Sequence, residues 1–341
     1  MRWSTLLVGL IGICACQTAD ERVIEPAFYH WQTQVAIGDA ERALLDSLAV
    51  DRLYLKFFDV DWSTTHNAAV PLAPVQAGPT PLPVAELVPT VFITNRTLKN
   101  TPPDQLSALA KSISAKLTRL VAQFPAARVV EWQFDCDWTA TTRDRYFALL
   151  RELNQLTELP LSATIRLHQI ADPKGTGIPP VNRGMLMYYN TGELRDWATQ
   201  NSILEDATAA PYLSRLSDYP LPLDVALPIF RWGVIFHPTG EVHLLNNLTA
   251  ADIEADTSVQ WLGPNRAEVR TGTYLRGRYL SAGDRIRLET ISPAELRQAA
   301  ERLREVSTPD SLRVVFYQLD AMVAERYSVG NFKEVLEVWS H

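Results

Sequence analysis

The chain alternates between short runs rich in β-branched and aromatic residues and longer segments whose apolar residues recur every three or four positions. The first pattern is typical of buried strands and the second of amphipathic helices. Strand-like runs occur at residues 27–31, 52–61, 89–95, 128–137, 161–169, 184–190, 223–232 and 312–320. Strand and helix patterns that alternate eight times predict an α/β fold, the (β/α)8 TIM-type barrel.

Helix-start signals support this alternation. Thr101 stands before two prolines, Thr141 or Thr142 precedes another apolar-periodic segment, and Ser292 with Glu295 forms a capping-box pattern. One interval disagrees with the barrel pattern, because residues 171–183, between strands five and six, contain no clear helix.

The length of 341 residues allows one large domain or two ordinary ones. A barrel of ordinary size needs roughly 250 residues, so a one-domain interpretation requires insertions. Residues 63–88 are rich in Pro and Ala and are expected to form a long loop over one end. Residues 237–291 are expected to form a β-rich insertion between strands seven and eight, inside a barrel domain that covers 26–341.

The N-terminus predicts export. Residues 6–13 form an apolar run after Arg2, too short to span a bilayer but suited to a signal peptide over 1–15. The sequence Cys14-Ala15-Cys16 resembles a bacterial lipobox, in which Cys16 becomes the lipidated N-terminus and 16–25 a polar tether. The alternatives are an ordinary secretory signal or a cytoplasmic protein with an apolar start. The lipobox predicts a protein of the bacterial cell envelope that is held in a membrane, the outer rather than the inner, by its lipid.

Composition narrows the classes of function. With 47% hydrophobic residues and a net charge of −7, the chain is not a disordered protein. Lys and Arg number 32 against 39 acidic residues and do not cluster, which argues against a nucleic-acid partner. The sequence has no phosphate-binding loop, nucleophile elbow or paired Cys motif, so we expect no cofactor and no metal.

Active residues of barrel enzymes lie where strands end. The predicted strands of this chain end in polar and aromatic residues, which are the candidates for substrate binding: Trp31, Asp59, Asp61, Arg166, His168, Tyr189, Asn190 and Trp232. Single histidines without metal-ligand spacing are more often structural, and this applies to His30 and His168.

The fourth predicted strand carries the most specific pattern. Alternation places Gln133, Asp135 and Asp137 on one face, while Phe134, Cys136 and Trp138 share the other. The apolar face should pack on helices, which directs two carboxylates into the barrel mouth and leaves Cys136 an inert buried thiol. Carboxylates this close repel, so one tends to hold a proton, as a general acid must.

The same carboxylates have other interpretations. They could cap helices or pair with Arg166 or Arg231 across the barrel. They could also join Asp59 and Asp61 in an oxygen-rich cation site, if strands two and four converge.

The segment from Gln133 to Asp137 resembles the Asp-x-x-Asp-x-Asp-x-Glu strand of family 18 chitinase-like glycoside hydrolases, and Met187-Tyr-Tyr-Asn190 is similar to their Met-x-Tyr-Asp/Asn. This resemblance implies a (β/α)8 barrel with a proton-donating acid on strand four. One alignment puts Thr139 at the acid position, and an alignment shifted by two puts Asp137 there. The whole mature chain also resembles the bacterial barrel lipoproteins of the family DUF3142, which carry a Gln-x-Asp-x-Asp signature.

Together these features predict a glycoside hydrolase that acts on an extracellular or cell-wall glycan. Asp137 would be the general acid/base and Asp135 its modulator, with Gln133, Tyr189 and Asn190 positioning the sugar. Trp31 and Trp232 would stack on sugar rings or belong to the core. The alternatives are a non-catalytic lipoprotein that binds a carbohydrate or a partner, and a hydrolase of another bond that uses a bound cation.

Overall fold

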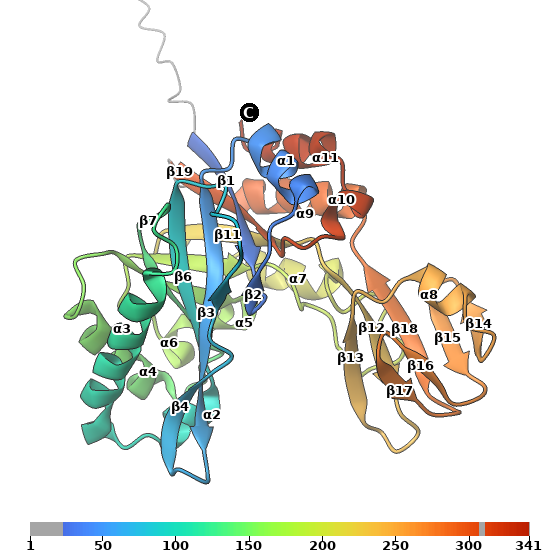
Figure 1. Cartoon of the computed structure of the whole chain (residues 1–341), viewed down its shortest axis with the longest axis horizontal. Coiled ribbons are helices and arrows are strands. Elements are labelled where there is room, and N and C mark those ends of the chain that lie inside the picture. The colour runs from blue at the N-terminus through green and yellow to red at the C-terminus, as the bar shows by residue number, and fades with distance from the viewer. Residues whose placement is uncertain (1–22, 307–310, 341) are drawn as a thin grey trace, which may run out of the picture.

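Eight parallel strands close into a barrel in this computed structural model, which describes residues 23–306 and 311–340 (Figure 1). Pairing of β3 with β6 completes the ring. The barrel strands are β1 (Val23–His30), β3 (Arg52–Ser63), β6 (Glu86–Ile93), β8 (Trp132–Asp135), β9 (Leu161–Arg166), β10 (Arg183–Met187), β11 (Leu223–Pro228) and β19 (Ser311–Tyr317). The predicted (β/α)8 barrel is therefore confirmed.

Helices cover the outside of the barrel and follow most strands. They are α1 (Asp39–Ser47), α2 (Asn95–Asn100), α3 (Leu106–Val121), α4 (Arg143–Asn154), α5 (Leu167–Ala171), α6 (Pro173–Thr176), α7 (Asp206–Leu213), α9 (Pro293–Val306), α10 (Val323–Arg326) and α11 (Val329–Glu337), with a 3-10 turn at Pro103–Gln105. The capping box of α9 forms, because Ser292 and Glu295 bond each other's backbone N–H. Helices α5 and α6 are only one turn each, which explains the weak helix signal at 171–183. None of the described helices is long and apolar enough to cross a membrane.

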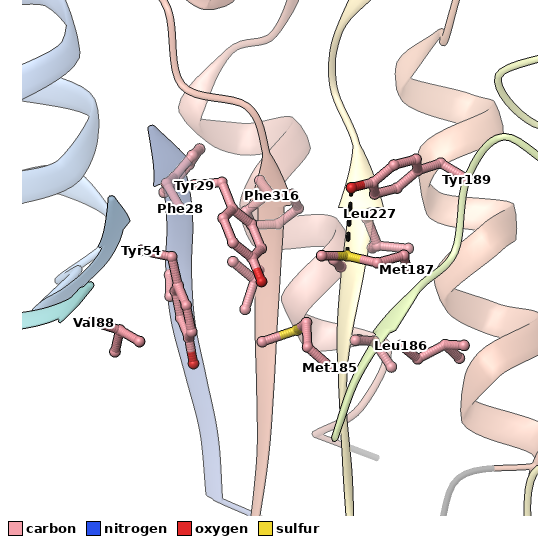
Figure 2. Close-up of a cluster of buried hydrophobic side chains, with 14 of the residues drawn as sticks. Phe28, Tyr29, Tyr54, Val88, Met185, Leu186, Met187, Tyr189, Leu227 and Phe316 are labelled. Atoms are coloured by element: carbon pink, nitrogen blue, oxygen red, sulfur yellow. Dashed lines mark hydrogen bonds between the residues drawn. The ribbon is translucent and has the colours of Figure 1, made fainter. Parts of the chain in front are cut away.

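Apolar side chains alternate between the inside and the outside of the barrel. Figure 2 shows Tyr29, Tyr54, Met185 and Met187 among the buried side chains of neighbouring strands. On the outer surface, Phe28 and Phe316 pack against Phe332 of α11, with ring centroids 5.5 and 4.7 Å apart. The residues that share a strand face in sequence thus build two layers of core.

A β-rich insertion lies between β11 and β19. Five antiparallel strands form its sheet: β12 (Arg231–Phe236), β13 (Val242–Asn246), β14 (Val259–Gly263), β15 (Arg266–Val269) and β18 (Arg285–Thr290). A short helix α8 (Ala250–Glu254) and the hairpin of β16 (Thr273–Leu275) and β17 (Arg278–Leu280) complete it. Figure 1 shows this sheet standing to one side of the barrel.

Several predicted boundaries differ from the structure. The strand predicted at 223–232 breaks after Pro228, so the inserted sheet begins at Arg231 and not at 237. The strand β1 begins at Val23, inside the predicted tether 16–25, because Glu25 pairs with two arginines of neighbouring strands and is not a solvated linker residue. The rest of that tether, the signal peptide and Cys16 lie outside the described residues.

Residues 63–88 also differ from a simple loop over the barrel end. Strand β4 (Ala68–Leu72) continues β3 as an antiparallel hairpin, and β5 (Gln76–Ala77) pairs with β2 (Gln34–Val35). The chain thus returns along the outside of the barrel without a helix, to β6. The short β7 (Arg128–Val129) precedes β8, so the strand predicted at 128–137 is interrupted.

Candidate functional site

Three polar side chains of the β8 segment lie at increasing height in the barrel. Gln133 is fully buried, Asp135 is 5% exposed, and the Asp137 side chain, just beyond the strand end, is 55% exposed. The opposite face, Phe134, Cys136 and Trp138, is completely buried. The alternation seen in the sequence therefore holds, and it places one carboxylate below the mouth and one within it.

Gln133 lies in the barrel interior and lines neither of the two mouth cavities. Its Oε1 accepts hydrogen bonds from the Tyr29 hydroxyl at 2.5 Å and from Thr90 Oγ1 at 3.3 Å. Its Nε2 donates to Ser162 Oγ at 3.2 Å. These bonds hold Gln133 as a support beneath the site, away from direct contact with a ligand.

Asp135 is the more protected carboxylate. Its Oδ1 accepts a hydrogen bond from Thr164 Oγ1 at 2.6 Å and lies 3.6 Å from Arg166 Nη2. Burial raises the pKa of Asp135, and the nearby Asp137 raises it further, against the opposing effect of Arg166. Of the two carboxyl groups, Asp135 is thus the one whose surroundings favour a bound proton.

Asp137 forms an ion pair with Arg166, whose Nε donates to Asp137 Oδ1 at 2.5 Å. Burial disfavours the charged guanidinium, but Asp135, Tyr189 and Asp137 outweigh it and raise the pKa of Arg166. The guanidinium of Arg166 therefore stays charged beside the two carboxyl groups. Of the two arginines expected to pair with these carboxylates, Arg166 does so, whereas Arg231 pairs with Glu325.

Two cavities share the floor made by Asp137, Arg166, Tyr189 and Asn190. The larger, of about 560 Å³, extends toward α5 and α7 and is also lined by Asn95, Thr139, Leu167, His168, Thr191, Thr208 and Tyr212. The smaller, of about 420 Å³, extends toward the inserted sheet and is also lined by Trp31, Lys56, Asp59, Phe92, Asp135, Phe230, Arg231, Trp232, Asn246, Asn247, Tyr317 and Gln318. No residue from 63–88 lines either one, so the mouth is open.

Aromatic rings form a continuous wall in the smaller cavity. Trp31 contacts Tyr317 at 5.7 Å between ring centroids, Tyr317 contacts Phe230 at 5.8 Å, and Phe230 contacts Trp232 at 5.0 Å. Tyr189 stacks on Tyr317 at 5.0 Å and donates to Met187 Sδ, the bond drawn in Figure 2. Flat apolar faces next to polar groups are the surfaces on which sugar rings pack.

The two aspartates of β3, Asp59 and Asp61, differ in their position relative to the cavities. Asp59 lines the smaller cavity and pairs with Lys56 Nζ at 2.8 Å. Asp61 lines neither cavity, and its carboxylate accepts hydrogen bonds from Arg96 and Thr94. The hydrogen bond from Arg96 is the main reason that the pKa of Asp61 is lowered to about 2.

These pairings count against the cation-site hypothesis. The carboxylates of strands two and four, Asp59, Asp61, Asp135 and Asp137, each have a cationic partner within the protein. Among the described residues, no group of three His, Cys, Asp or Glu could hold a metal ion.

Burial accounts for the properties of His30, His168 and Cys136. His30 is buried, and burial lowers its pKa to about 4. His168 lines the larger cavity, and partial burial lowers its pKa as well. Cys136 is a free thiol whose pKa is raised by burial, so it is poorly suited to be a nucleophile.

Sequence reasoning missed Lys56 and the two asparagines of the inserted sheet, Asn246 and Asn247. A bulge explains why Lys56 was missed, because β3 changes register against β6 between Lys56 and Phe58. This extra residue lets Lys56 and Asp59, three positions apart, line the same cavity. No local pattern marks the asparagines, which reach the mouth only through the packing of the insertion.

No protein-family model and no curated protein matches this sequence. Several solved structures do share its fold. A spore cortex-lytic enzyme of Bacillus cereus superposes with a TM-score of 0.54 and 13% identity, covering 93% of this chain and 74% of that one. A chitinase of Chromobacterium violaceum gives 0.52 and 12%, covering 92% and 99%. A GH18 chitinase of Flavobacterium johnsoniae gives 0.52 and 11%, covering 93% and 94%. At these identities the likeness shows the fold alone, which is a (β/α)8 barrel.

Proposed function

We propose that the barrel mouth binds a glycan and that binding, more than hydrolysis, is its activity. The observation that carries this is the Arg166–Asp137 ion pair at 2.5 Å in an open, aromatic-lined groove. A general acid must present its carboxyl group to the oxygen of the leaving group, whereas Asp137 Oδ1 is already bound by the Arg166 guanidinium. The groove itself keeps what a sugar needs: aromatic faces, amide groups and charged hydrogen-bonding groups.

The proteins with the same fold support a glycan as the ligand. They include chitinases and a spore cortex-lytic enzyme. The increasing exposure of Gln133, Asp135 and Asp137 supports the alignment in which Asp137 occupies the acid position. On that alignment the chain has Asp, one methylene shorter, where those hydrolases have Glu. A shorter carboxylate that is bound by Arg166 is consistent with a barrel that binds a sugar but has no residue able to act as general acid.

Hydrolysis by general acid catalysis is the second candidate. Two observations favour it: Asp137 lines both cavities, and burial raises the pKa of the neighbouring Asp135. In this reaction Asp137 would donate the proton once a bound ligand displaces Arg166, while Asp135 modulates it and Tyr189 and Asn190 orient the sugar.

One assay separates the two candidates. A panel of N-acetylated oligosaccharides is tested for binding by calorimetry and for turnover by release of reducing ends, with wild type, Asp137→Asn and the control Asp46→Asn on exposed α1. We expect binding without turnover in the wild type. Asp137→Asn should weaken binding by about tenfold, because a charged hydrogen-bonding group of the groove is lost.

The other outcomes are equally informative. Turnover that disappears in Asp137→Asn but not in Asp46→Asn would establish the hydrolase. Turnover that both variants retain would show that Asp137 is not the general acid. A wild type that binds none of the oligosaccharides would overturn the glycan site altogether.

We also propose that the protein acts in the bacterial cell envelope, attached to a membrane through a lipid on Cys16. The lipobox-like sequence Cys14-Ala15-Cys16 supports this proposal. An extracellular or cell-wall glycan would then be the ligand within reach.

A further inference from the structure

We propose that the smaller cavity recognises a sugar residue that carries a carboxylate, and that Arg231 binds this carboxylate. The inference rests on the proposed glycan binding and names the class of glycan. Its basis is the arrangement of charge and hydrogen-bonding capacity between the barrel mouth and the inserted sheet.

The cations of this cavity are compensated to different degrees. Lys56 lies 2.8 Å from Asp59, and Arg166 lies 2.5 Å from Asp137. Among the described residues, Arg231 is paired with Glu325 alone, whose carboxylate is 3.6 Å from Nη2 and 57% exposed. That separation is beyond hydrogen-bond distance, and water weakens the attraction to so exposed a carboxylate. Arg231 is thus the least neutralised of the three.

Arg231 also has unused donors. Its side chain is 12% exposed, and its Nε and Nη2 are buried without a hydrogen-bond partner among the described residues. A buried donor without a partner costs free energy, which a ligand that accepts its hydrogen bond recovers. The guanidinium presents its donors as a planar fork that matches a carboxylate in two parallel bonds.

The carboxylates of the cavity would not repel such a ligand strongly. Asp59 and Asp137 are each bound to a cation at short distance. Asp135 is buried, and burial raises its pKa toward a neutral carboxyl group. An incoming carboxylate therefore meets the undercompensated Arg231, the Lys56–Asp59 pair, and Arg166, which Asp135 and Asp137 share.

The surroundings of Arg231 suit the rest of a sugar. Trp232, the next residue, is fixed by a hydrogen bond from its Nε1 to Glu289 at 2.6 Å and continues the aromatic wall. Gln318 has a buried, unpartnered Oε1 that could accept from a hydroxyl, and Asn246 and Asn247 add amide groups. The cavity of about 420 Å³ lies within the range of small-ligand sites.

Carboxylates occur on sugars as uronic acids and as the lactyl ether of muramic acid, and the test includes both sources. Calorimetry on the full chain compares a hyaluronan tetrasaccharide with its carboxyl-reduced form, and an N-acetylglucosamine–N-acetylmuramic acid tetrasaccharide with its carboxamide. Chitotetraose is the neutral reference. The protein variants are Arg231→Gln, Arg231→Lys and Arg195→Gln, the last a matched loss of an exposed arginine that lines neither cavity.

We expect wild type and Arg195→Gln to bind at least one acidic oligosaccharide about tenfold or more tightly than its neutral counterpart. Arg231→Gln should bind the acidic and the neutral form of each pair equally. Arg231→Lys should keep part of the preference and show that charge, not folding, is what the glutamine variant lost. The pair that shows the preference identifies the source of the carboxylate.

Two results would overturn the proposal, and they differ in meaning. If the wild type binds acidic and neutral forms equally, or if Arg231→Gln keeps the preference, the carboxylate site is wrong while glycan binding stands. If the wild type binds none of the five oligosaccharides, the proposed function fails together with the inference.

Discussion

Burial separates the two carboxyl groups of the β8 segment, although they are only two residues apart. Asp135 lies inside the barrel wall with Thr164, while Asp137 reaches the open mouth and Arg166. The folded protein therefore binds the Asp135 proton more tightly than the unfolded chain does, because burial raises the pKa above its usual 3.8.

This difference predicts a pH-dependent effect of Asp135→Asn. As the pH rises from about 4 to about 7, ionisation of Asp135 in the wild type lowers the free energy of unfolding, and the variant lacks this loss. Relative to the wild type, the variant should thus gain stability across that range, by about 1 kcal/mol. Urea denaturation at both pH values measures it, with Asp46→Asn as the exposed control. A variant that instead loses stability toward neutral pH would mean that the ionised Asp135 is held by Arg166 more strongly than burial opposes it.

For single residues, the sequence predicts which side of a strand a side chain lies on, but not which residue it pairs with across the barrel. Alternation along 133–138 correctly divides the polar from the apolar residues. It leaves Arg166 and Arg231 as equal candidates for the ion pair, because each follows a different strand and the distance across the barrel depends on closure. Lys56 could not be predicted from the alternation either, because the bulge in β3 places it in the same cavity as Asp59.

Helices marked by local signals agree with their predictions, whereas two strand boundaries that depend on long-range pairing differ from theirs. The α9 capping box and the apolar stripe of α3 are local. The start of β1 at Val23 depends on pairing with β19, nearly the whole chain away, and the break after Pro228 depends on β12 pairing with β18 instead of continuing the barrel.

The inserted sheet depends on one buried carboxylate. Glu289 of β18 is 1% exposed and accepts hydrogen bonds from Ser202 Oγ at 2.6 Å, Trp232 Nε1 at 2.6 Å and Arg287 Nε at 2.5 Å. It thereby joins β18, β12 and the segment after β10. Because Arg287 is itself fully buried, it has no water to replace this partner.

Glu289→Gln should therefore lower the free energy of unfolding by about 3 kcal/mol, since it leaves the Arg287 charge buried without its counter-ion. The matched control in the same sheet is Glu268→Gln, which removes the carboxylate of a partly exposed pair with Arg270 and should cost less than about 1 kcal/mol. Chemical denaturation of both variants provides the comparison. Equal losses in the two would show that burial of the Glu289–Arg287 pair adds nothing.

At the scale of the molecule, the two ends of the barrel differ in character. The carboxyl ends of the strands open into the two cavities. The opposite end is closed by an ion-pair network around Arg313, which lies 3.2 Å from Glu25, 2.8 Å from Glu131 and 3.3 Å from Asp224. A ligand of the two cavities would therefore enter at the carboxyl ends of the strands. Val23 begins β1 at the closed end, and the eight residues of β1 carry the chain about 26 Å toward the mouth (Figure 1).

If Cys16 carries a lipid, this geometry attaches the protein by its closed end and directs the mouth away from the membrane. We expect cells fed labelled palmitate to label the wild type and not Cys16→Ala, and the wild type to fractionate with membranes while the variant is released. Cys14→Ala is the matched control and should behave as the wild type, because Cys14 leaves with the signal peptide. Labelling that persists in Cys16→Ala would refute the anchor. The orientation has its own measurement: wild type in vesicles should bind a soluble oligosaccharide with the same affinity as the released variant, whereas a mouth that faces the bilayer would bind it more weakly.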